Sequence, residues 1–360
     1  MNIADMHCDT IAELYYRKRD GKAFDIKTAD LQINLDKMKT GGYLLQNFGC
    51  FLNLKKVKEP FDYENRLMDV FDEEIGKYPE LIRRVKTCGD IEKNRQDGVM
   101  SALLTMEEGE ACEGSPDKMR HFYDRGARMM TLTWNYENSL AFPNRINAET
   151  GESIPDTENG LKKKGFEMIE AMEDTGMIID VSHLSDKGIW DVIGSTKKPF
   201  AASHSNAREV TNHPRNLTDE MIRAMAQRGC ITGINYCFDF LKDKKNAGSP
   251  EQAGSLPVKN AENCSLSSQC IRHIRHLVNK GGIDFVGLGS DFDGIENPVE
   301  WGDAAGMPEF VNALEKAGFS SSEIDKITYK NVLRLYREVL DSSVSSVSSV
   351  PSVSSVPSVS

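Results

Sequence analysis

The chain has 360 residues, of which 39% are hydrophobic, and its formal net charge is -11. So acidic a surface repels a phosphate backbone and argues against nucleic acid as a partner. No run of about 18 apolar residues is present, and the N-terminus lacks the basic and then apolar build of a signal peptide, so we expect a soluble, cytoplasmic protein without a membrane anchor. The eight cysteines form no CxxC pair, so neither a zinc–thiolate site nor a disulfide framework is expected.

Eight short apolar segments are expected to form β-strands. Most of them are continuously apolar and do not alternate with polar residues, which is typical of parallel strands that are buried on both faces. The segments are residues 3–9, 43–51, 99–106, 128–133, 177–182, 200–203, 230–235 and 285–290.

Helical patterns separate these segments, and eight alternations of strand and helix predict an α/β fold, the closed (β/α)8 TIM barrel. A doubly wound open sheet is the alternative. The last helix begins with an S-x-x-E capping box that is formed by Ser320 and Glu323. The predicted helices are residues 62–78, 118–126, 160–174, 186–194, 219–227, 266–279, 308–316 and 323–340.

We expect residues 1–341 to form one barrel domain. Residues 342–360 repeat Ser, Val and Pro without a helix or strand period, and this tail is expected to be disordered. Two polar insertions, at 143–160 and 242–262, follow strand ends and are expected to lie over the C-terminal face of the barrel. A solvated surface loop is the alternative for the second insertion.

Residues of the metal-ligand type follow several of the predicted strands. Within segment 3–9 the side chains of a strand alternate, so an imidazole and a carboxylate two residues apart share one face. In a TIM barrel the catalytic groups come from the C-terminal ends of different strands, so these side chains are expected to converge at one mouth. They are His7 and Asp9 in the first segment, Glu107 after the third, His183 after the fifth, His204 after the sixth and Asp291 after the eighth.

This mixture of nitrogen and oxygen ligands suits zinc or another first-row divalent ion. Because one zinc ion needs only three protein ligands and a water, the set is better matched to two ions that share a bridging carboxylate, and Glu107 is the natural bridge. Each residue also has a plainer interpretation. A histidine after a buried strand can be a hydrogen-bonded core residue, and Asp291 and Asp293 can be turn formers.

Arg215 lies between the sixth strand and the helix at 219–227. Its guanidinium can hold a substrate carboxylate by a bidentate pair, and a surface arginine is the alternative. The remaining histidines, His121, His273 and His276, fall in helical patterns with charged neighbours and are expected to be solvated.

Together these residues resemble the zinc-dependent renal or membrane dipeptidases and their bacterial relatives. The matching motifs occur in the order of that family and cover residues 3–340. They are His7-x-Asp9, Glu107 with Glu108-Gly109, Asp180-Val181-Ser182-His183, Ser203-His204-Ser205, Arg215-Asn216 and Gly289-Ser290-Asp291-Phe292-Asp293-Gly294.

The resemblance implies a (β/α)8 barrel and two Zn²⁺ ions per chain, with other divalent first-row metals as alternatives. It places His7 and Asp9 on one zinc ion and His183 and His204 on the other, with Glu107 as the bridge. Family members often form dimers, so a homodimer is the assembly that the resemblance suggests.

The implied activity is that of a metallopeptidase of the membrane dipeptidase type, which hydrolyses dipeptides with a metal-bridging hydroxide. Asp291 would be the acid/base, and Arg215 would hold the C-terminal carboxylate of the substrate. Three alternatives stay open: a binuclear amidohydrolase that acts on N-acyl amino acids or lactams, a non-catalytic metal-binding homologue, and a structural barrel without metal.

Two residues depart from the family pattern. Where well-known mammalian members have a histidine near the scissile carbonyl, this chain has Trp134, whose indole donates one N–H but neither takes a proton nor binds metal. Asn135 is an alternative donor to the substrate at this place. Glu108 replaces a glycine that is common after the bridging glutamate.

Overall fold

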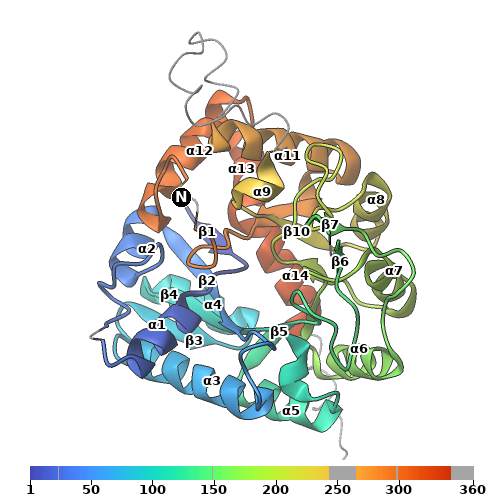
Figure 1. Cartoon of the computed structure of the whole chain (residues 1–360). Coiled ribbons are helices and arrows are strands. Elements are labelled where there is room, and N and C mark those ends of the chain that lie inside the picture. The colour runs from blue at the N-terminus through green and yellow to red at the C-terminus, as the bar shows by residue number, and fades with distance from the viewer. Residues whose placement is uncertain (23, 148, 243–264, 297–298, 342–360) are drawn as a thin grey trace, which may run out of the picture.

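The structure is a computed structural model that describes residues 1–22, 24–147, 149–242, 265–296 and 299–341. Eight parallel strands form a closed barrel inside a ring of helices (Figure 1). The barrel closes because the first strand pairs with both the second and the last, which confirms the (β/α)8 fold and rules out the open sheet. In the order of pairing the strands are β1 (Ile3–Asp5), β2 (Tyr43–Phe51), β4 (Met100–Glu107), β5 (Ala127–Thr131), β8 (Ile178–Asp180), β9 (Ala201–Ala202), β10 (Ile231–Ile234) and β11 (Val286–Leu288).

Every predicted strand segment overlaps one barrel strand. β4 extends one residue beyond its segment, β5 begins one residue before its segment, and β1 ends earlier than predicted. β1 stops at Asp5, so His7 and Asp9 lie beyond the strand. The Asp5 carboxylate accepts hydrogen bonds from the backbone N–H groups of His7 (3.2 Å) and of the distant Ser290 (2.9 Å), and these take the place of ladder hydrogen bonds. A further strand, β3 (Ile82–Val85), pairs with the start of β4 and was not predicted, because two arginines interrupt its short apolar pattern.

Among the described residues, four helices were not predicted: α1, α2, α4 and the short α9. In α4 only three residues are buried, so its sequence lacks a long apolar stripe. The helices are α1 (Thr10–Arg19), α2 (Leu35–Gly41), α3 (Pro60–Gly76), α4 (Cys88–Asp97), α5 (Pro116–Arg125), α6 (Lys163–Thr175), α7 (Asp186–Ser195), α8 (Asp219–Gln227), α9 (Phe238–Leu241), α11 (Leu266–Gly281), α12 (Met307–Lys316), α13 (Ser321–Asp325) and α14 (Asn331–Leu340), with 3-10 turns at Gly109–Cys112, Ile283–Phe285 and Ala304–Gly306.

The predicted helix at 323–340 is divided into α13 and α14 by a π-helical turn at Lys326–Lys330. The capping box is confirmed: the Ser320 hydroxyl accepts from the Glu323 N–H (3.3 Å), and the Glu323 carboxylate accepts from the Ser320 N–H (2.8 Å).

Helix α14 closes one end of the barrel. Its buried residues Val332, Leu335 and Tyr336 pack in one apolar cluster with Ala4 and Leu45, which lie near the starts of their strands. Because the N-terminal ends of the strands are covered in this way, the C-terminal ends form the face on which a site can open.

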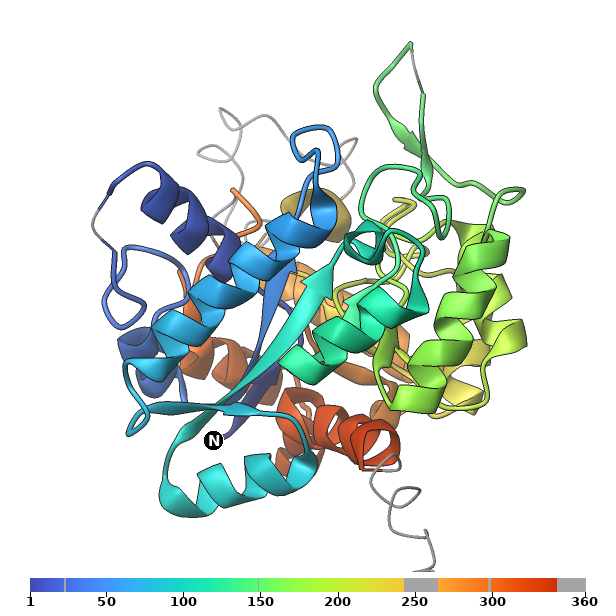
Figure 2. The same cartoon turned by 90° about the horizontal axis from the view of Figure 1, so that it is seen from below.

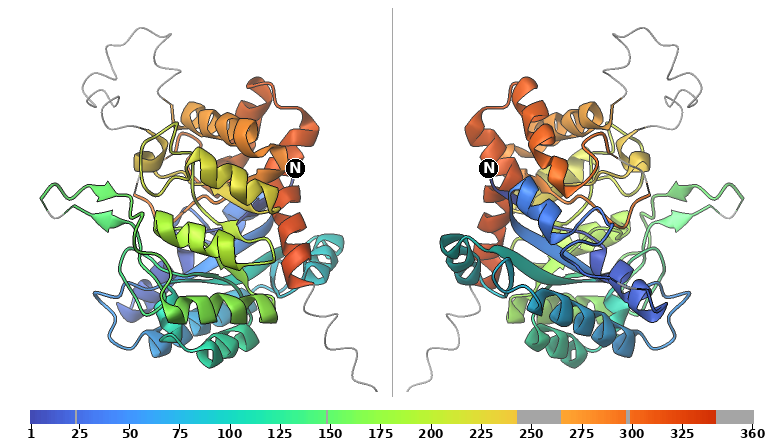
Figure 3. Two further views of the ribbon diagram at one scale, coloured as in Figure 1. Left: turned by 90° about the vertical axis from the view of Figure 1, so that its right-hand side faces the viewer. Right: turned by 90° about the vertical axis from the view of Figure 1, so that its left-hand side faces the viewer.

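The first polar insertion, at 143–160, contains an antiparallel hairpin of β6 (Arg145–Ile146) and β7 (Ser153–Ile154). The hairpin projects from the barrel (Figure 2; Figure 3). Residues 243–262 of the second insertion and the tail at 342–360 lie outside the described residues, so the predictions made for them stay predictions. Among the helices that the structure describes, none combines the length and the apolar character needed to cross a membrane.

One acidic side chain in the wall of the barrel lacks a partner. Glu64 on α3 is fully buried, and neither of its carboxyl oxygens has a hydrogen-bond partner in the described part of the chain. Burial raises the pKa of Glu64 well above its ordinary value of 4.5. The folded protein therefore keeps this carboxyl protonated at a pH at which the unfolded chain has released the proton. The buried carboxyl does not lower the free energy of unfolding below pH 4.5, where it is protonated in both the folded and the unfolded chain. As the pH rises above 4.5, the free energy of unfolding falls, because the unfolded chain releases the proton and the folded protein keeps it.

We therefore expect Glu64→Met to raise the free energy of unfolding by about 2–4 kcal/mol at pH 8 and by about 1 kcal/mol or less at pH 4.5. Urea titrations at the two pH values measure this difference. Glu170→Met, on an exposed site of α6, is the matched control and should change the free energy of unfolding by less than about 0.5 kcal/mol at either pH. A Glu64→Met protein that is less stable than the wild type at pH 8 would contradict the assignment.

Candidate metal centre

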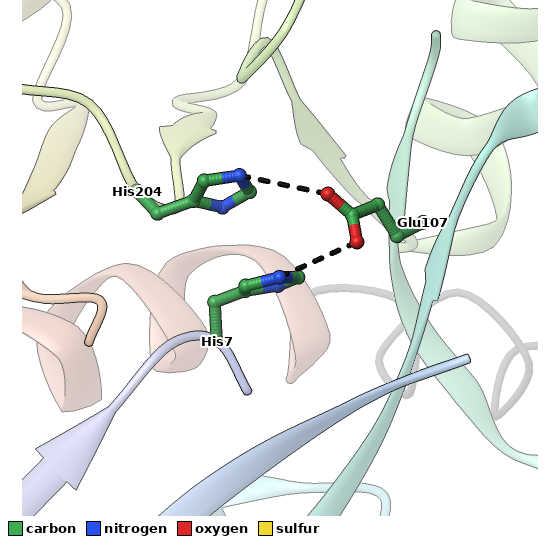
Figure 4. A group of neighbouring side chains, drawn as sticks. All are labelled: His7, Glu107 and His204. Carbon is green, nitrogen blue, oxygen red and sulfur yellow. Dashed lines mark ion pairs between the residues drawn. The ribbon is translucent and has the colours of Figure 1, made fainter. Parts of the chain in front are cut away.

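The predicted metal ligands meet at the C-terminal ends of four barrel strands, around the Glu107 carboxylate. Glu107 is the last residue of β4, and its Oε2 lies 3.4 Å from Nε2 of His7. Its Oε1 lies 3.0 Å from Nε2 of His183 and 3.6 Å from Nε2 of His204. Figure 4 shows the Glu107 carboxylate between the rings of His7 and His204. Asp9 joins the group, with Oδ2 3.6 Å from Nε2 of His7, and all five side chains are buried.

The ligand atoms form two overlapping groups that could each hold an ion. One is His7, Glu107 and His204, and the other is His7, Asp9 and Asp291; within each group the atoms lie within 4.8 Å of one another. The resemblance divides the ligands differently, with His183 beside His204. The structure places those two rings together as well, because their Nε2 atoms are 2.9 Å apart.

The hydrogen bonds of the two later histidines leave both Nε2 atoms without a proton. The Ser203 hydroxyl donates to Asp180 (2.5 Å), so its oxygen accepts from Nδ1–H of His204 (2.6 Å). In the same way Nδ1–H of His183 donates to Oδ1 of Asn135 (3.0 Å). Burial and nearby positive charges lower the pKa of both rings well below its usual range, so both rings are neutral. A neutral imidazole with a free Nε2 lone pair is the form that binds metal.

This arrangement fits a divalent metal ion. Two unprotonated ring nitrogens face each other and a carboxylate oxygen, so their lone pairs repel unless a cation lies between them. Nε2 of His7 and Oδ1 of Asp9 are also buried, and within the described residues neither has a hydrogen-bond partner. Buried polar atoms without partners are costly, and a metal ion held by nitrogen and oxygen would satisfy them.

A second layer of hydrogen bonds orients the ligands, and Asp180 at the end of β8 is its centre. Its carboxylate accepts from the Thr131 hydroxyl (2.7 Å), from the Ser203 hydroxyl and from the Ser203 N–H (2.8 Å). Asp180 thus connects β5, β8 and β9 directly behind the two histidines. Asp180 and Ser203 belong to motifs that are visible in the sequence, but their role in orienting the ligands depends on contacts between separate strands and could not be predicted from it.

The two aspartates after β11 have different surroundings. Both have positive backbone φ angles, 62° for Asp291 and 66° for Asp293. Asp293 accepts from the Thr10 hydroxyl (2.6 Å) and the Gln32 N–H (2.6 Å), which is the behaviour expected of a turn former. Asp291 instead faces the site: Asn235 donates to its Oδ2 (2.9 Å), and its Oδ1 lies 3.7 Å from Nε2 of His7. Burial raises the pKa of Asp291 to about 6.

Two adjoining cavities open at this end of the barrel. The first, of about 300 Å³, is lined by Glu107 and Asp291. The second, of about 220 Å³, is lined by Arg215. The residues that line both cavities are Asn135, His183 and Phe240. A ligand can therefore extend from the metal ligands to Arg215.

Arg215 is not a surface arginine, because only 9% of it is exposed. Its guanidinium lies 5.3 Å from the centre of the Phe240 ring, and its Nε and Nη2 atoms have no hydrogen-bond partner among the described residues. Arg208 holds the backbone on both sides of it, donating to the carbonyl oxygens of Pro214 (2.9 Å) and Asn216 (2.9 Å). Arg208 was not predicted as a site residue, because only the folded loop brings its guanidinium to the backbone around Arg215.

Trp134 and Asn135 both lie at the cavities. Trp134 is half-buried in the first cavity, with its ring 4.9 Å from that of Phe51 and 6.2 Å from that of His183. Its backbone N–H donates to the Glu108 carboxylate (2.9 Å). Glu108 has φ 128°, a left-handed value that explains why a glycine suits this position. In this chain the Glu108 side chain holds the loop that carries Trp134.

The prediction that all three remaining histidines are solvated is wrong for His273. This ring is fully buried on α11 and accepts from the Ala207 N–H (3.1 Å). It lies on the face of the helix that packs against the barrel. His121 is exposed, and His276 is half-buried beside Asp219.

Comparison with known proteins agrees with this geometry. The family model described as membrane dipeptidase (peptidase family M19) matches residues 1–349. A protein in the pqqA 5′ region of Klebsiella pneumoniae is 32% identical over 281 residues, which cover 78% of this chain and 97% of that protein. An uncharacterized dipeptidase of Schizosaccharomyces pombe is 28% identical over 318 residues, or 85% of this chain and 71% of that protein.

Among solved structures, a metallopeptidase from Rhodobacter sphaeroides liganded with a phosphinate mimic of the dipeptide L-Ala-D-Ala has the same barrel fold. The TM-score is 0.82 at 22% identity, with 94% of this chain and 99% of that chain covered. The match of the family model over nearly the whole chain shows that this protein is a metallopeptidase and belongs to the membrane dipeptidase family, peptidase family M19.

Proposed function

We propose that the protein hydrolyses dipeptides at a binuclear zinc centre, with Asp291 as the acid/base and Arg215 as the residue that holds the substrate carboxylate. One observation carries this proposal: two adjoining cavities are lined by metal-ligating side chains and by a buried guanidinium whose Nε and Nη2 have no hydrogen-bond partner in the described part of the chain. The residues that would hold the two ions are His7, Asp9, Glu107, His183 and His204.

When bound, the two ions would polarise the scissile carbonyl and lower the pKa of a water molecule toward about 7. Asp291 takes a proton from the attacking water and returns it to the leaving amine. Its geometry suits both steps, because Asn235 holds Oδ2, Oδ1 lies 3.7 Å from Nε2 of His7, and Asp291 lines the first cavity.

Arg215 restricts the substrates to those with a free carboxylate one residue beyond the scissile bond. A guanidinium presents N–H groups in a planar fork that matches both oxygens of a carboxylate. Because Nε and Nη2 of Arg215 are buried and have no hydrogen-bond partner among the residues that the structure describes, a bound carboxylate would supply hydrogen bonds that these residues do not. This selection distinguishes a dipeptidase from an endopeptidase.

The names of relatives point to the same substrate class. The Schizosaccharomyces pombe relative is named a dipeptidase, and the ligand of the Rhodobacter sphaeroides structure mimics a dipeptide. Asn135 accepts from His183 through its Oδ1, so its side-chain NH2 group stays the alternative donor to the substrate carbonyl where Trp134 replaces the family histidine.

The experiment that tests the proposal is amine release from a panel of L,L- and L,D-dipeptides and N-acetyl amino acids. We expect release from dipeptides alone, with loss of activity after chelation and recovery when zinc is added. Elemental analysis should find two zinc ions per chain. Cleavage of N-acetyl amino acids alone would replace the proposal with an amidohydrolase of another specificity. Absence of turnover in a protein with two bound zinc ions would indicate a non-catalytic homologue.

A further inference from the structure

The cavity that contains Arg215 has the β6–β7 hairpin as one of its walls. Ile146, Gly151 and Ser153 of the hairpin segment line this cavity together with Arg215. If the substrate carboxylate is bound by Arg215 and the scissile bond lies beside Glu107, the side chain of the second residue must lie in or beside this cavity. The inference therefore rests on the proposed function and extends it to substrate selection.

The register of the hairpin determines which side chains face the cavity. Ile146 pairs with Ser153, and Arg145 pairs with Ile154. Cross-strand partners lie on the same face of a hairpin, and successive residues lie on opposite faces. Ile146 and Ser153 thus form an inner face that lines the cavity, while Arg145 and Ile154 form an outer face that does not line it.

Ile146 is unusual in its exposure. Its side chain is 58% exposed, and it is one of four large hydrophobic side chains that are exposed in the described part of the chain. An aliphatic side chain that lines a cavity while remaining open to water gains free energy when a ligand covers it. The neighbours of Ile146 in the cavity include Pro143 and Phe240, which are also apolar.

The base of the hairpin is held in a defined position relative to the site. The Asn144 side-chain amide donates to the carbonyl oxygens of Pro214 (3.0 Å) and Leu184 (3.4 Å), and its Oδ1 accepts from the Asp156 N–H (2.9 Å). Pro214 precedes Arg215, and Leu184 follows His183. One buried amide thus joins the hairpin to the loops that carry the proposed carboxylate anchor and a proposed metal ligand.

We propose that the inner face of the hairpin, Ile146 with Ser153, is the subsite for the side chain of the second substrate residue. Because the contact that Ile146 offers is apolar and the cavity measures about 220 Å³, the enzyme favours dipeptides whose second residue carries a compact aliphatic side chain. A lysine at the second position loses hydration in this subsite without gaining an acidic partner, because no carboxylate is among the described residues that line the cavity.

The test compares kcat/KM for Ala-Leu, Ala-Gly and Ala-Lys in the zinc-loaded full-length protein. We expect Ile146→Ala to lower the ratio of Ala-Leu to Ala-Gly by about 3–10-fold, the range for loss of one or two buried carbons of contact. Ile154→Ala, which removes an isoleucine from the outer face of the same hairpin, should leave that ratio at the wild-type value. Ser153→Asp should raise the ratio of Ala-Lys to Ala-Leu by about 5-fold or more, because it adds a negative charge to the inner face.

An unchanged Ala-Leu to Ala-Gly ratio in Ile146→Ala, or an equal fall in Ile154→Ala, would overturn the subsite. Ser153→Asp tests the same face of the hairpin through a higher relative activity on Ala-Lys, so this test does not depend on how well Ile146→Ala folds. Failure of the proposed function would look different, because the wild-type protein would then cleave none of the three dipeptides.

Discussion

Replacing Asp291 by asparagine is expected to lower kcat by about 10²–10⁴-fold, the range that general acid–base catalysis contributes. Asparagine keeps the size of the side chain and can still accept from Asn235, but it cannot take a proton from water or return one to the amine. The metal content should remain that of the wild type, because the five proposed ligands are unchanged. Steady-state kinetics and elemental analysis of the same preparation measure both quantities.

Asp293→Asn is the matched comparison for this experiment. Asp293 belongs to the same turn and is also buried with a positive φ angle, but its oxygens are engaged by Thr10 and the backbone of Gln32. We expect its replacement to cost about 1–2 kcal/mol of stability and far less of kcat than that of Asp291. Turnover in Asp291→Asn close to that of the wild type would show that another group carries the proton.

Removing the guanidinium of Arg215 is expected to have the second largest effect. A charge-assisted hydrogen bond contributes about 1.5–3 kcal/mol, so Arg215→Ala should raise KM for Ala-Ala by about 10–100-fold. The same variant should change KM for Ala-Ala amide by less than about 3-fold, because the amide carries no charge for the guanidinium to bind.

Arg215→Lys provides the graded control. Lysine retains the positive charge but cannot form the bidentate pair, so its KM for Ala-Ala should lie between the values of the wild type and Arg215→Ala. If Arg215→Ala raises KM equally for the free dipeptide and its amide, the residue supports the fold of the cavity and does not bind the carboxylate.

Most of the fold could be predicted from the sequence, because burial on both faces makes the barrel strands continuously apolar. Segment 43–51 coincides with β2, and each of the other seven segments overlaps its strand. The same reasoning singled out the residues of the candidate site, since Glu107, His183 and His204 come at or shortly after strand ends and a barrel brings those ends together. The resemblance to a family added roles to residues that the pattern had already singled out.

Other features depend on contacts between residues far apart in the chain. The end of β1 at Asp5 follows from hydrogen bonds to His7 and Ser290, and no local pattern near residue 5 indicates the second of these. Helix α4 has too few buried residues to show a stripe, although Thr87 and Asp90 cap it. His273 has charged neighbours along the chain but packs inward, so composition alone suggested exposure.

The sequence by itself determined the order of strands and helices and the residue types at the strand ends, because hydrophobic periodicity and chemical identity are local properties. Only the tertiary structure decided which atoms face one another. It placed Asp180 behind His204 and turned Ile146 toward the cavity that Arg215 lines. It also left Nε and Nη2 of Arg215 without hydrogen-bond partners among the described residues. These are distances between separate segments of the chain, and they exist only once the barrel has closed.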